Sequence, residues 1–274
     1  MKGKKRNRLP QPNAAAGISG GLSVDFATMT FVFGVILVAG LVQTVTGFAY
    51  ALIAVPLLAL VTSPREAIVL VLFTGMLMKV VMVVKTWHDG DFSRIWLIFA
   101  ASVAGGVPGA FVLRWIDDGA LKIFISVALL CCTAALCADC KVAIRRPRLA
   151  QSVVGALSGF LGATTAFNGP PIVLYMMNEN EDKVVMRANL VRYFILGNIV
   201  TLAMGAMVGS LPLDGNILPY ALISLPAVGI AWWLGNKVFQ GMNPVVFRRL
   251  AMTIIGGSAV VTLGSGLAPW LLGQ

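Results

Sequence analysis

GFLGATTAFNGPPIVLYMMN, residues 159–178, is mostly apolar but contains three consecutive helix breakers, Gly169, Pro170 and Pro171. Proline removes a backbone donor and clashes with the preceding turn, and glycine enforces a helix poorly. In hydrocarbon, the freed backbone groups are tolerated only where protein or a water-filled cavity receives them. The stretch therefore predicts that one half-helix ends near Phe167 and that a second begins at the prolines. Asn168 is predicted to be the N-cap of the second half-helix.

The composition of the whole chain indicates an integral membrane protein. Of its 274 residues, 58% are hydrophobic and 12% are charged, whereas soluble domains carry about 25% charged residues. Apolar runs of about 18 residues or more, each able to cross a hydrocarbon layer of roughly 30 Å, recur along the sequence. We expect an all-α, polytopic helical bundle.

Ten apolar segments divide the chain into two halves of five. The segments are Phe26–Val45, Gly47–Thr62, Pro64–Val84, Ile95–Trp115, Ala120–Ala138, Leu149–Phe167, Gly169–Met177, Val184–Val208, Ile217–Phe239 and Val245–Leu267. Each half contains one short segment broken by Gly or Pro, so we predict two homologous transmembrane repeats with roughly eight to ten crossings. The predicted repeats span 25–140 and 149–274, and the basic loop 141–148 connects them. Weak internal symmetry is typical of secondary transporters.

The net charge of +10 is concentrated in the arm 1–24 and in the loop 141–148. Both regions adjoin apolar segments, where excess Lys and Arg marks cytoplasmic loops. The charge therefore indicates a lipid bilayer as the partner, not a nucleic acid. We predict that the arm, the loop and both termini are cytoplasmic, with the halves parallel because Gly47–Thr62 does not cross. If all five segments of the first half cross, the halves are inverted instead.

Polar residues at the two breaks form the predicted binding site. The N-terminus of a half-helix inside the membrane presents N–H groups and a partial positive charge, which suit an anion. The binding residues predicted at the breaks are Gln43, Thr44, Thr46 and Gly47 in the first half and Asn168, Gly169, Pro170 and Pro171 in the second. The alternative is a proline kink packed against a neighbour, which is the preferred interpretation of Pro56.

Three basic residues lie within or near apolar segments, where charges are costly and usually face an interior cavity. Arg192 lies three residues from Asn189, so the two share a helix face and both join the predicted site. The alternative for Arg192 is a hydrogen bond to carbonyls at a helix end. Arg187 and Lys79 lie near enough to segment ends to reach the interface, so both interpretations stay open for them.

Catalytic and metal-binding residues are missing from the apolar segments. All eleven Asp and Glu residues lie in loops or at segment ends, and the single histidine, His88, lies in a loop. We therefore predict neither an enzyme nor a cofactor or metal site. The four cysteines are interpreted as packing residues, with redox or sulfur chemistry as the alternative. The pairs Gly105/Gly109, Gly155/Gly159 and Gly205/Gly209 predict close approach of helices.

The broken segments resemble the TauE/SafE family of membrane anion transporters, often called sulfite exporters. The resemblance lies in Gly47–Leu60 (GFAYALIAVPLLAL), Ser63–Ala67 (SPREA), Gly159–Gly162 and Asn168–Tyr175, and it spans nearly the whole chain after the arm. It implies movement of sulfite, sulfonates or related small anions across the bacterial inner membrane. The family is often richer in glycine before the double proline than Ala163–Phe167 is here, which leaves the exact substrate open.

These observations together predict a secondary transporter that exports sulfite or a short organosulfonate bound between the two broken segments. A transporter of other small sulfur-containing or carboxylate anions and an anion channel are the alternatives. The sequence is compatible with a homo-oligomer.

Overall fold

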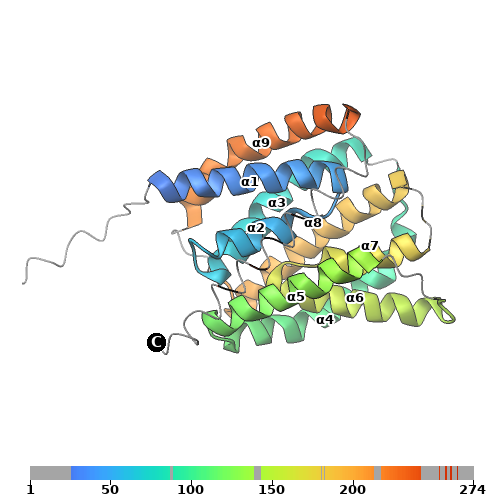
Figure 1. The fold of residues 1–274 in the computed structure, drawn as a ribbon. Coiled ribbons are helices and arrows are strands. Elements are labelled where there is room, and N and C mark those ends of the chain that lie inside the picture. Colours follow the sequence, from blue (N-terminus) through green and yellow to red (C-terminus); the bar gives the residue numbers. More distant parts are fainter. Residues whose placement is uncertain are drawn as a thin grey trace, which may run out of the picture.

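The computed structural model describes residues 26–86, 89–138, 143–179, 181, 183–212 and 217–241, together with residues 253, 257, 260 and 264. Every regular element in these residues is helical (Figure 1). The elements are α1 (Phe26–Thr46), α2 (Tyr50–Leu58), α3 (Pro64–Thr86), η1 (Phe92–Arg94), α4 (Trp96–Trp115), α5 (Asp118–Ala138), α6 (Pro147–Thr165), α7 (Gly169–Asn178), α8 (Lys183–Val208) and α9 (Leu218–Gly241). The predicted helical bundle is thus confirmed. The tenth predicted segment, Val245–Leu267, and the arm 1–24 fall on residues outside this description.

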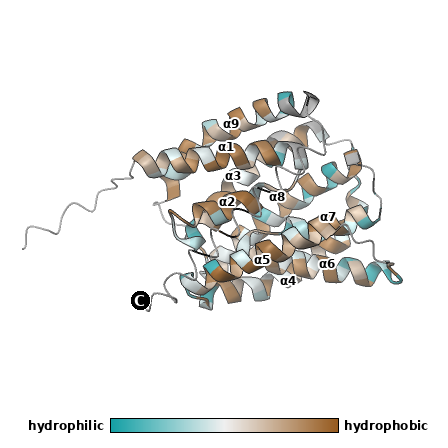
Figure 2. Cartoon of the chain, viewed as in Figure 1, coloured by the Kyte–Doolittle hydropathy of each residue, from teal (hydrophilic) through white to brown (hydrophobic). Residues whose placement is uncertain are grey.

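Six of the described helices, α1, α3, α4, α5, α8 and α9, are long and apolar enough to cross a membrane. Figure 2 shows hydrophobic residues along their length and hydrophilic residues mainly toward the ends of the bundle. Large apolar side chains such as Phe26, Trp115 and Met207 are 84%, 83% and 87% exposed. Contact with lipid tails accounts for such an apolar outer surface. The prediction of a multi-pass membrane protein is confirmed.

Two helix pairs flank a central pair formed by α3 and α8. In one flanking pair, α1 packs along α9: a Cβ atom at Gly40 would lie 2.6 Å from Cβ of Ala231, and one at Gly235 would lie 2.7 Å from Cβ of Thr44. The contacts advance in the same order on both helices, so α1 and α9 run in the same direction. The other flanking pair, α4 and α6, also runs in one direction, because Gly155 of α6 faces Ile98 of α4 and Gly159 faces Ser102.

Glycine brings the backbones of α4 and α6 into direct contact. A Cβ atom at Gly159 would lie 1.9 Å from the carbonyl oxygen of Ser102, and one at Gly105 would lie 2.1 Å from that of Ala156. A side chain at either position would force the helices apart. The close approach predicted for Gly105/Gly109 and Gly155/Gly159 is therefore confirmed.

The third glycine pair, Gly205/Gly209, does not form the close helix–helix contact that its spacing predicted. Gly205 packs against the side chain of Leu211, which follows the same helix, and Gly209 ends α8 with a φ of +68°. A glycine in the left-handed conformation is a common helix terminator. The two glycines therefore serve the end of α8 and not a contact between helices.

Each helical segment reverses the direction of the one before it, so α1 and α6 run in opposite directions (Figure 1). The end of α1 lies beside the start of α8, where Arg187 donates to the carbonyl of Thr44 at 3.1 Å. The middle of α6 lies beside the first turns of α4, and the two helices advance together: a Cβ atom at Gly155 would be 2.3 Å from the carbonyl oxygen of Ile98, and one at Gly159 would be 1.9 Å from that of Ser102. The prediction of parallel halves is wrong. The short helix α2 turns back along α1, which adds a reversal that the charge rule did not anticipate.

Candidate functional site

The two helix breaks are built in the same way. After α1, Gly47 has a φ of 85°, and after α6, Ala166 has a φ of 62°. The last residue of each helix is a threonine, Thr46 or Thr165, whose hydroxyl donates to the carbonyl four residues earlier at 2.9 and 2.8 Å. Each hydroxyl also accepts from the N–H two residues later, at 3.4 and 3.3 Å. The threonines therefore satisfy backbone groups that each break releases.

The side chain of Gln43 spans the first break. Its Nε2 donates to the carbonyl of Gly47 at 2.8 Å, and its Oε1 accepts from the N–H of Tyr50, the first residue of α2, at 3.0 Å. The neighbouring Thr44 donates to the carbonyl of Gly40 at 2.9 Å and packs against Gly235 of α9. Gln43 and Thr44 thus hold the backbone and the helix pair together.

Asn168 occupies the N-cap position of α7, but its side chain makes no capping hydrogen bond. A capping side chain accepts from the N–H groups two or three residues later. Those residues are Pro170 and Pro171, which have no N–H, so the predicted cap is wrong. Among the described residues, the amide of Asn168 has no hydrogen-bond partner, while its backbone carbonyl accepts from the hydroxyl of Ser158. The side-chain amide of Asn168 therefore keeps its hydrogen-bonding capacity.

The second break begins α7 as predicted, with prolines in the first turn. α6 ends at Thr165 and α7 begins at Gly169. A Cβ atom at Gly169 would lie 3.5 Å from both Cβ and the carbonyl oxygen of Phe48, so the two breaks touch each other. The N-termini of α2 and α7 therefore meet inside the bundle.

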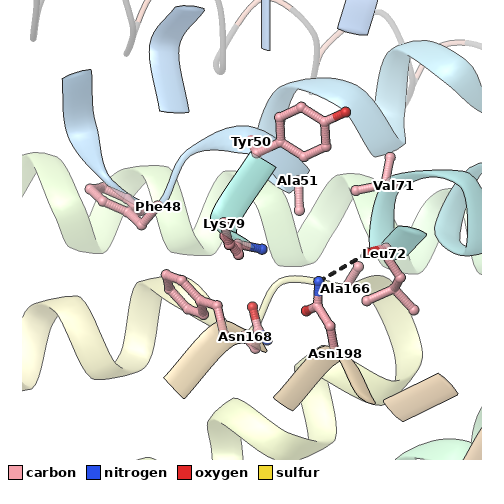
Figure 3. Close-up of a pocket in the computed structure, with 10 residues that line it drawn as sticks. Phe48, Tyr50, Ala51, Val71, Leu72, Lys79, Ala166, Asn168 and Asn198 are labelled. Atoms are coloured by element: carbon pink, nitrogen blue, oxygen red, sulfur yellow. Dashed lines mark hydrogen bonds between the residues drawn. The ribbon is translucent and has the colours of Figure 1, made fainter. Parts of the chain in front are cut away.

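A narrow cavity, with room for about one water molecule, lies where the breaks meet (Figure 3). Two of its walls are fixed by hydrogen bonds: Asn198 donates to the carbonyl of Leu72 at 3.0 Å, and the hydroxyl of Tyr50 donates to that of Thr74 at 2.7 Å. The lining residues are Phe48, Tyr50, Ala51, Val71, Leu72, Lys79, Ala166, Asn168, Phe194 and Asn198. Of the predicted site residues, the structure brings Asn168 into the wall of this cavity.

Lys79 of α3 is the charged residue in the cavity wall, and it is 7% exposed. Its Nζ lies 5.0 Å from the centroid of the Phe194 ring, which provides a cation–π contact. No carboxylate of the described residues pairs with Lys79, and the sequence 242–274 contains no Asp or Glu. A buried ammonium without a counter-ion is costly. The cavity is therefore suited to an anion.

Asn189 and Arg192 lie outside this cavity, although they share a helix face as predicted. Both side chains meet Gly90, whose carbonyl accepts from Nη1 of Arg192 at 3.0 Å. Asn189 accepts from the N–H of Asp91 at 2.9 Å and donates to Glu181 at 3.2 Å. The two residues join the loop after α3 to the segment after α7.

Ion pairs and perturbed carboxyl groups surround this loop contact. Arg94 lies 3.4 Å from a carboxylate oxygen of Asp91 and 3.7 Å from one of Glu181. Hydrogen bonds from Ser93 lower the pKa of Asp91, whereas burial raises the pKa of Glu181. The groups are satisfied mainly by one another, so the cluster links the loops. Arg192 also lines a second, mostly apolar cavity with Val80, Val83, Phe92, Ile195 and Leu196, and its predicted role in anion binding stays a prediction.

Sequence reasoning left Lys79 between two interpretations and did not include it in the site. One signal in the sequence could have assigned Lys79 to the site. Gly47 and Ala166, which follow α1 and α6 at the two breaks, are the same number of residues apart in the sequence as Lys79 and Asn198. Aligning the halves on their breaks thus pairs Lys79 with a polar residue in the middle of α8. A polar residue at both equivalent positions indicates an interior cavity.

Comparison with protein-family models matches residues 32–262 to the family described as sulfite exporter TauE/SafE. No curated protein and no solved structure matches the chain. The matched residues include both helix breaks and every residue that lines the cavity.

Proposed function

The chain belongs to the sulfite exporter TauE/SafE family, and from this premise we propose that it exports sulfite or a short organosulfonate across the bacterial inner membrane, with the anion bound in the cavity between the two helix breaks. The family is one of membrane anion transporters, not of enzymes. The transport is secondary, driven by gradients of the anion and of a coupling ion.

The observation that carries the proposal is the position of Lys79. Its ammonium lies in the wall of a cavity between the breaks, and no carboxylate of the described residues neutralises it. A bound oxyanion supplies the missing negative charge. A hydrogen bond to a charged group contributes about 1.5–3 kcal/mol, and charge-assisted contacts of this kind are short and strong.

The helix ends contribute less than the sequence suggested. At the first break, Thr46 and Gln43 already accept from the N–H groups of Phe48, Ala49 and Tyr50. At the second, the two prolines of the first turn have no N–H. The positive charge must therefore come mainly from Lys79, with the amide of Asn168 as a neutral donor. Gln43, Thr46, Gly47, Gly169, Pro170 and Pro171 act by shaping the breaks.

The walls of the cavity favour a compact anion. Phe48 and Phe194 line one part, Val71 and Leu72 another, and the space between is narrow. A compact oxyanion such as sulfite suits this narrow space best, and an organosulfonate would need the cavity to widen before its tail could lie against the apolar walls. A small carboxylate would meet the same ammonium, so competition between anions decides the substrate class.

The test is uptake of labelled sulfite, sulfoacetate and a simple carboxylate into proteoliposomes that contain the purified protein. Lys79→Gln should abolish saturable transport. The matched control is Lys237→Gln in α9, where the exposed ammonium lies 3.9 Å from the centroid of the Trp233 ring and outside the cavity. Wild-type transport by Lys79→Gln would overturn the site, and flux that does not saturate would favour a channel.

We also propose that residues 25–140 and 149–274 are inverted structural repeats. In support, the pairing of α1 with α9 corresponds to that of α6 with α4, and Thr46 and Thr165 occupy matching places at the breaks. Ten reversing segments would keep both termini on one side, and the basic arm favours the cytoplasm for that side. The basic loop 141–148 would then lie on the opposite side, against the prediction that it is cytoplasmic.

An exchange of the equivalent residues Lys79 and Asn198 tests this symmetry. The single variant Lys79→Asn should lose anion binding. The double variant Lys79→Asn/Asn198→Lys should bind the anion at least tenfold more tightly than the single variant, because the ammonium returns to the cavity from the opposite side. A double variant that keeps its melting temperature and binds no better than the single one would contradict the repeat.

A further inference from the structure

Lys79 has no paired carboxylate among the described residues, and this bears on which ion moves with the anion. The other polar side chains in the wall of its cavity are Tyr50, Asn168 and Asn198, which are uncharged at neutral pH. Tyr50 is bonded to Thr74, and Asn198 is bonded to the carbonyl of Leu72. Among the described residues, the cavity wall offers Lys79 no carboxylate, and the ring of Phe194 gives it only a cation–π contact.

Titratable groups on the helices that pack against α3 are held elsewhere. Arg187 and Arg192 of α8 donate to the carbonyls of Thr44 and Gly90, and Tyr193 is hydrogen-bonded to Ser158. On α5, Asp118 pairs with Arg65 of α3. None of these groups lines the cavity, nor do the remaining titratable residues of the described parts of α3, α5 and α9, which include Glu66, Lys122, Tyr220 and Lys237.

Binding of an anion and binding of a proton are therefore linked at Lys79. With the cavity empty, a desolvated ammonium without a counter-ion is unfavourable, and the neutral amine is preferred. With an anion present, the ammonium is preferred because it neutralises the anion. Linkage is reciprocal, so the proton tightens anion binding by the same factor as the anion tightens proton binding.

We propose that Lys79 carries one proton with each anion, so that the protein is an anion–proton symporter; this rests on the function proposed above. On the loading side, a proton from water binds the amine nitrogen as the anion enters the cavity. On the opposite side the anion leaves, and the nitrogen returns its proton to water. Each cycle moves one anion and one proton, and the transport of a singly charged anion moves no net charge. Export therefore takes place when the outward gradient of the anion exceeds the inward gradient of the proton.

This stoichiometry makes a quantitative difference to the driving force. A symporter of a singly charged anion accumulates it about tenfold for each unit of pH difference, and the membrane potential has no effect. If the cation stayed protonated throughout the cycle, a potential of 100 mV would act on one charge, or about 2.3 kcal/mol, which corresponds to roughly a 50-fold gradient. The two cases are therefore easy to distinguish.

Methanesulfonate is the suitable probe, because its charge does not change near neutral pH. Proteoliposomes with the wild-type protein should accumulate labelled methanesulfonate about tenfold under a pH difference of one unit, and not under a potential of 100 mV without a pH difference. Lys79→Arg keeps a cation that does not release its proton. That variant should respond to the potential and not to the pH difference, whereas Lys237→Gln should behave as wild type.

The wild-type measurement alone decides the proposal, even if Lys79→Arg is inactive. Accumulation that follows the potential and ignores the pH difference would overturn proton symport and leave the anion transporter standing. Failure of the wild-type protein to move methanesulfonate or sulfite faster than protein-free vesicles would overturn the proposed function itself, and proton symport with it.

Discussion

Replacing Asn168 with leucine should weaken anion binding without weakening the fold. The side-chain amide has no hydrogen-bond partner among the described residues, so the substitution breaks no bond within them. The bound anion, by contrast, loses one donor. A hydrogen bond to a charged group is worth about 1.5–3 kcal/mol, and each 1.36 kcal/mol is a factor of ten. The expected loss of affinity is therefore roughly 10- to 150-fold.

The assay measures affinity and melting temperature on the same purified protein. Asn198→Leu serves as the contrast, because Asn198 lines the same cavity but donates to the carbonyl of Leu72 in α3 at 3.0 Å. Its replacement should cost about 1 kcal/mol of stability through the lost bond between α8 and α3. Asn168→Leu should leave the melting temperature near that of the wild type.

A further substitution sharpens the test. Asn168→Asp places a carboxylate in the cavity with Lys79, where it competes with the substrate as the counter-ion. We expect it to abolish anion binding while raising the melting temperature. Unchanged affinity in Asn168→Leu together with a lowered melting temperature would refute the reasoning, because Asn168 would then be a structural residue.

Two other substitutions probe the packing and the excluded site residue. Gly159→Ala should lower stability by about 3 kcal/mol, because its Cβ atom would lie 1.9 Å from the carbonyl oxygen of Ser102 and overpacking of this kind is costly. Gly229→Ala in α9, where nothing lies within 4 Å, should leave the melting temperature unchanged or slightly raised. Arg192→Gln should lower the melting temperature through the lost bond to Gly90 and leave the anion affinity unchanged; a tenfold loss of affinity would return Arg192 to the site.

The positions of the helices could be predicted because the physics that sets them is local. The apolar runs end at charged or Gly/Pro-rich turns, and the observed helices begin and end within a few residues of most of the expected bounds. The second break was predictable for the same reason, since Gly169, Pro170 and Pro171 interrupt a helix wherever they occur. The failed cap at Asn168 was also a local matter, because prolines at the donor positions are visible in the sequence.

The orientation of the halves and the identity of the charged ligand depend on tertiary structure. Whether α2 continues along α1 or turns back is decided by its packing against α1 and α3 and by the side chain of Gln43. Lys79 and Arg192 lie on segments that are apolar on most faces, so periodicity does not reveal which face is inside. The structure turns Lys79 toward the cavity and Arg192 toward the loop at Gly90.

The hydrogen bonds made and left unmade by polar groups at the breaks suit a transporter whose site must change the side it faces both with and without a bound anion. If backbone N–H groups alone held the anion, the empty site would leave several of them unpaired, at about 1–3 kcal/mol each. Here Thr46 and Gln43 pair those groups at the first break, and proline removes them at the second. The remaining unsatisfied cation is an amine, which can become neutral by releasing a proton. An arginine in its place would stay charged in the empty state. In the proposed symport, lysine is therefore the residue that allows the empty protein to return without its anion.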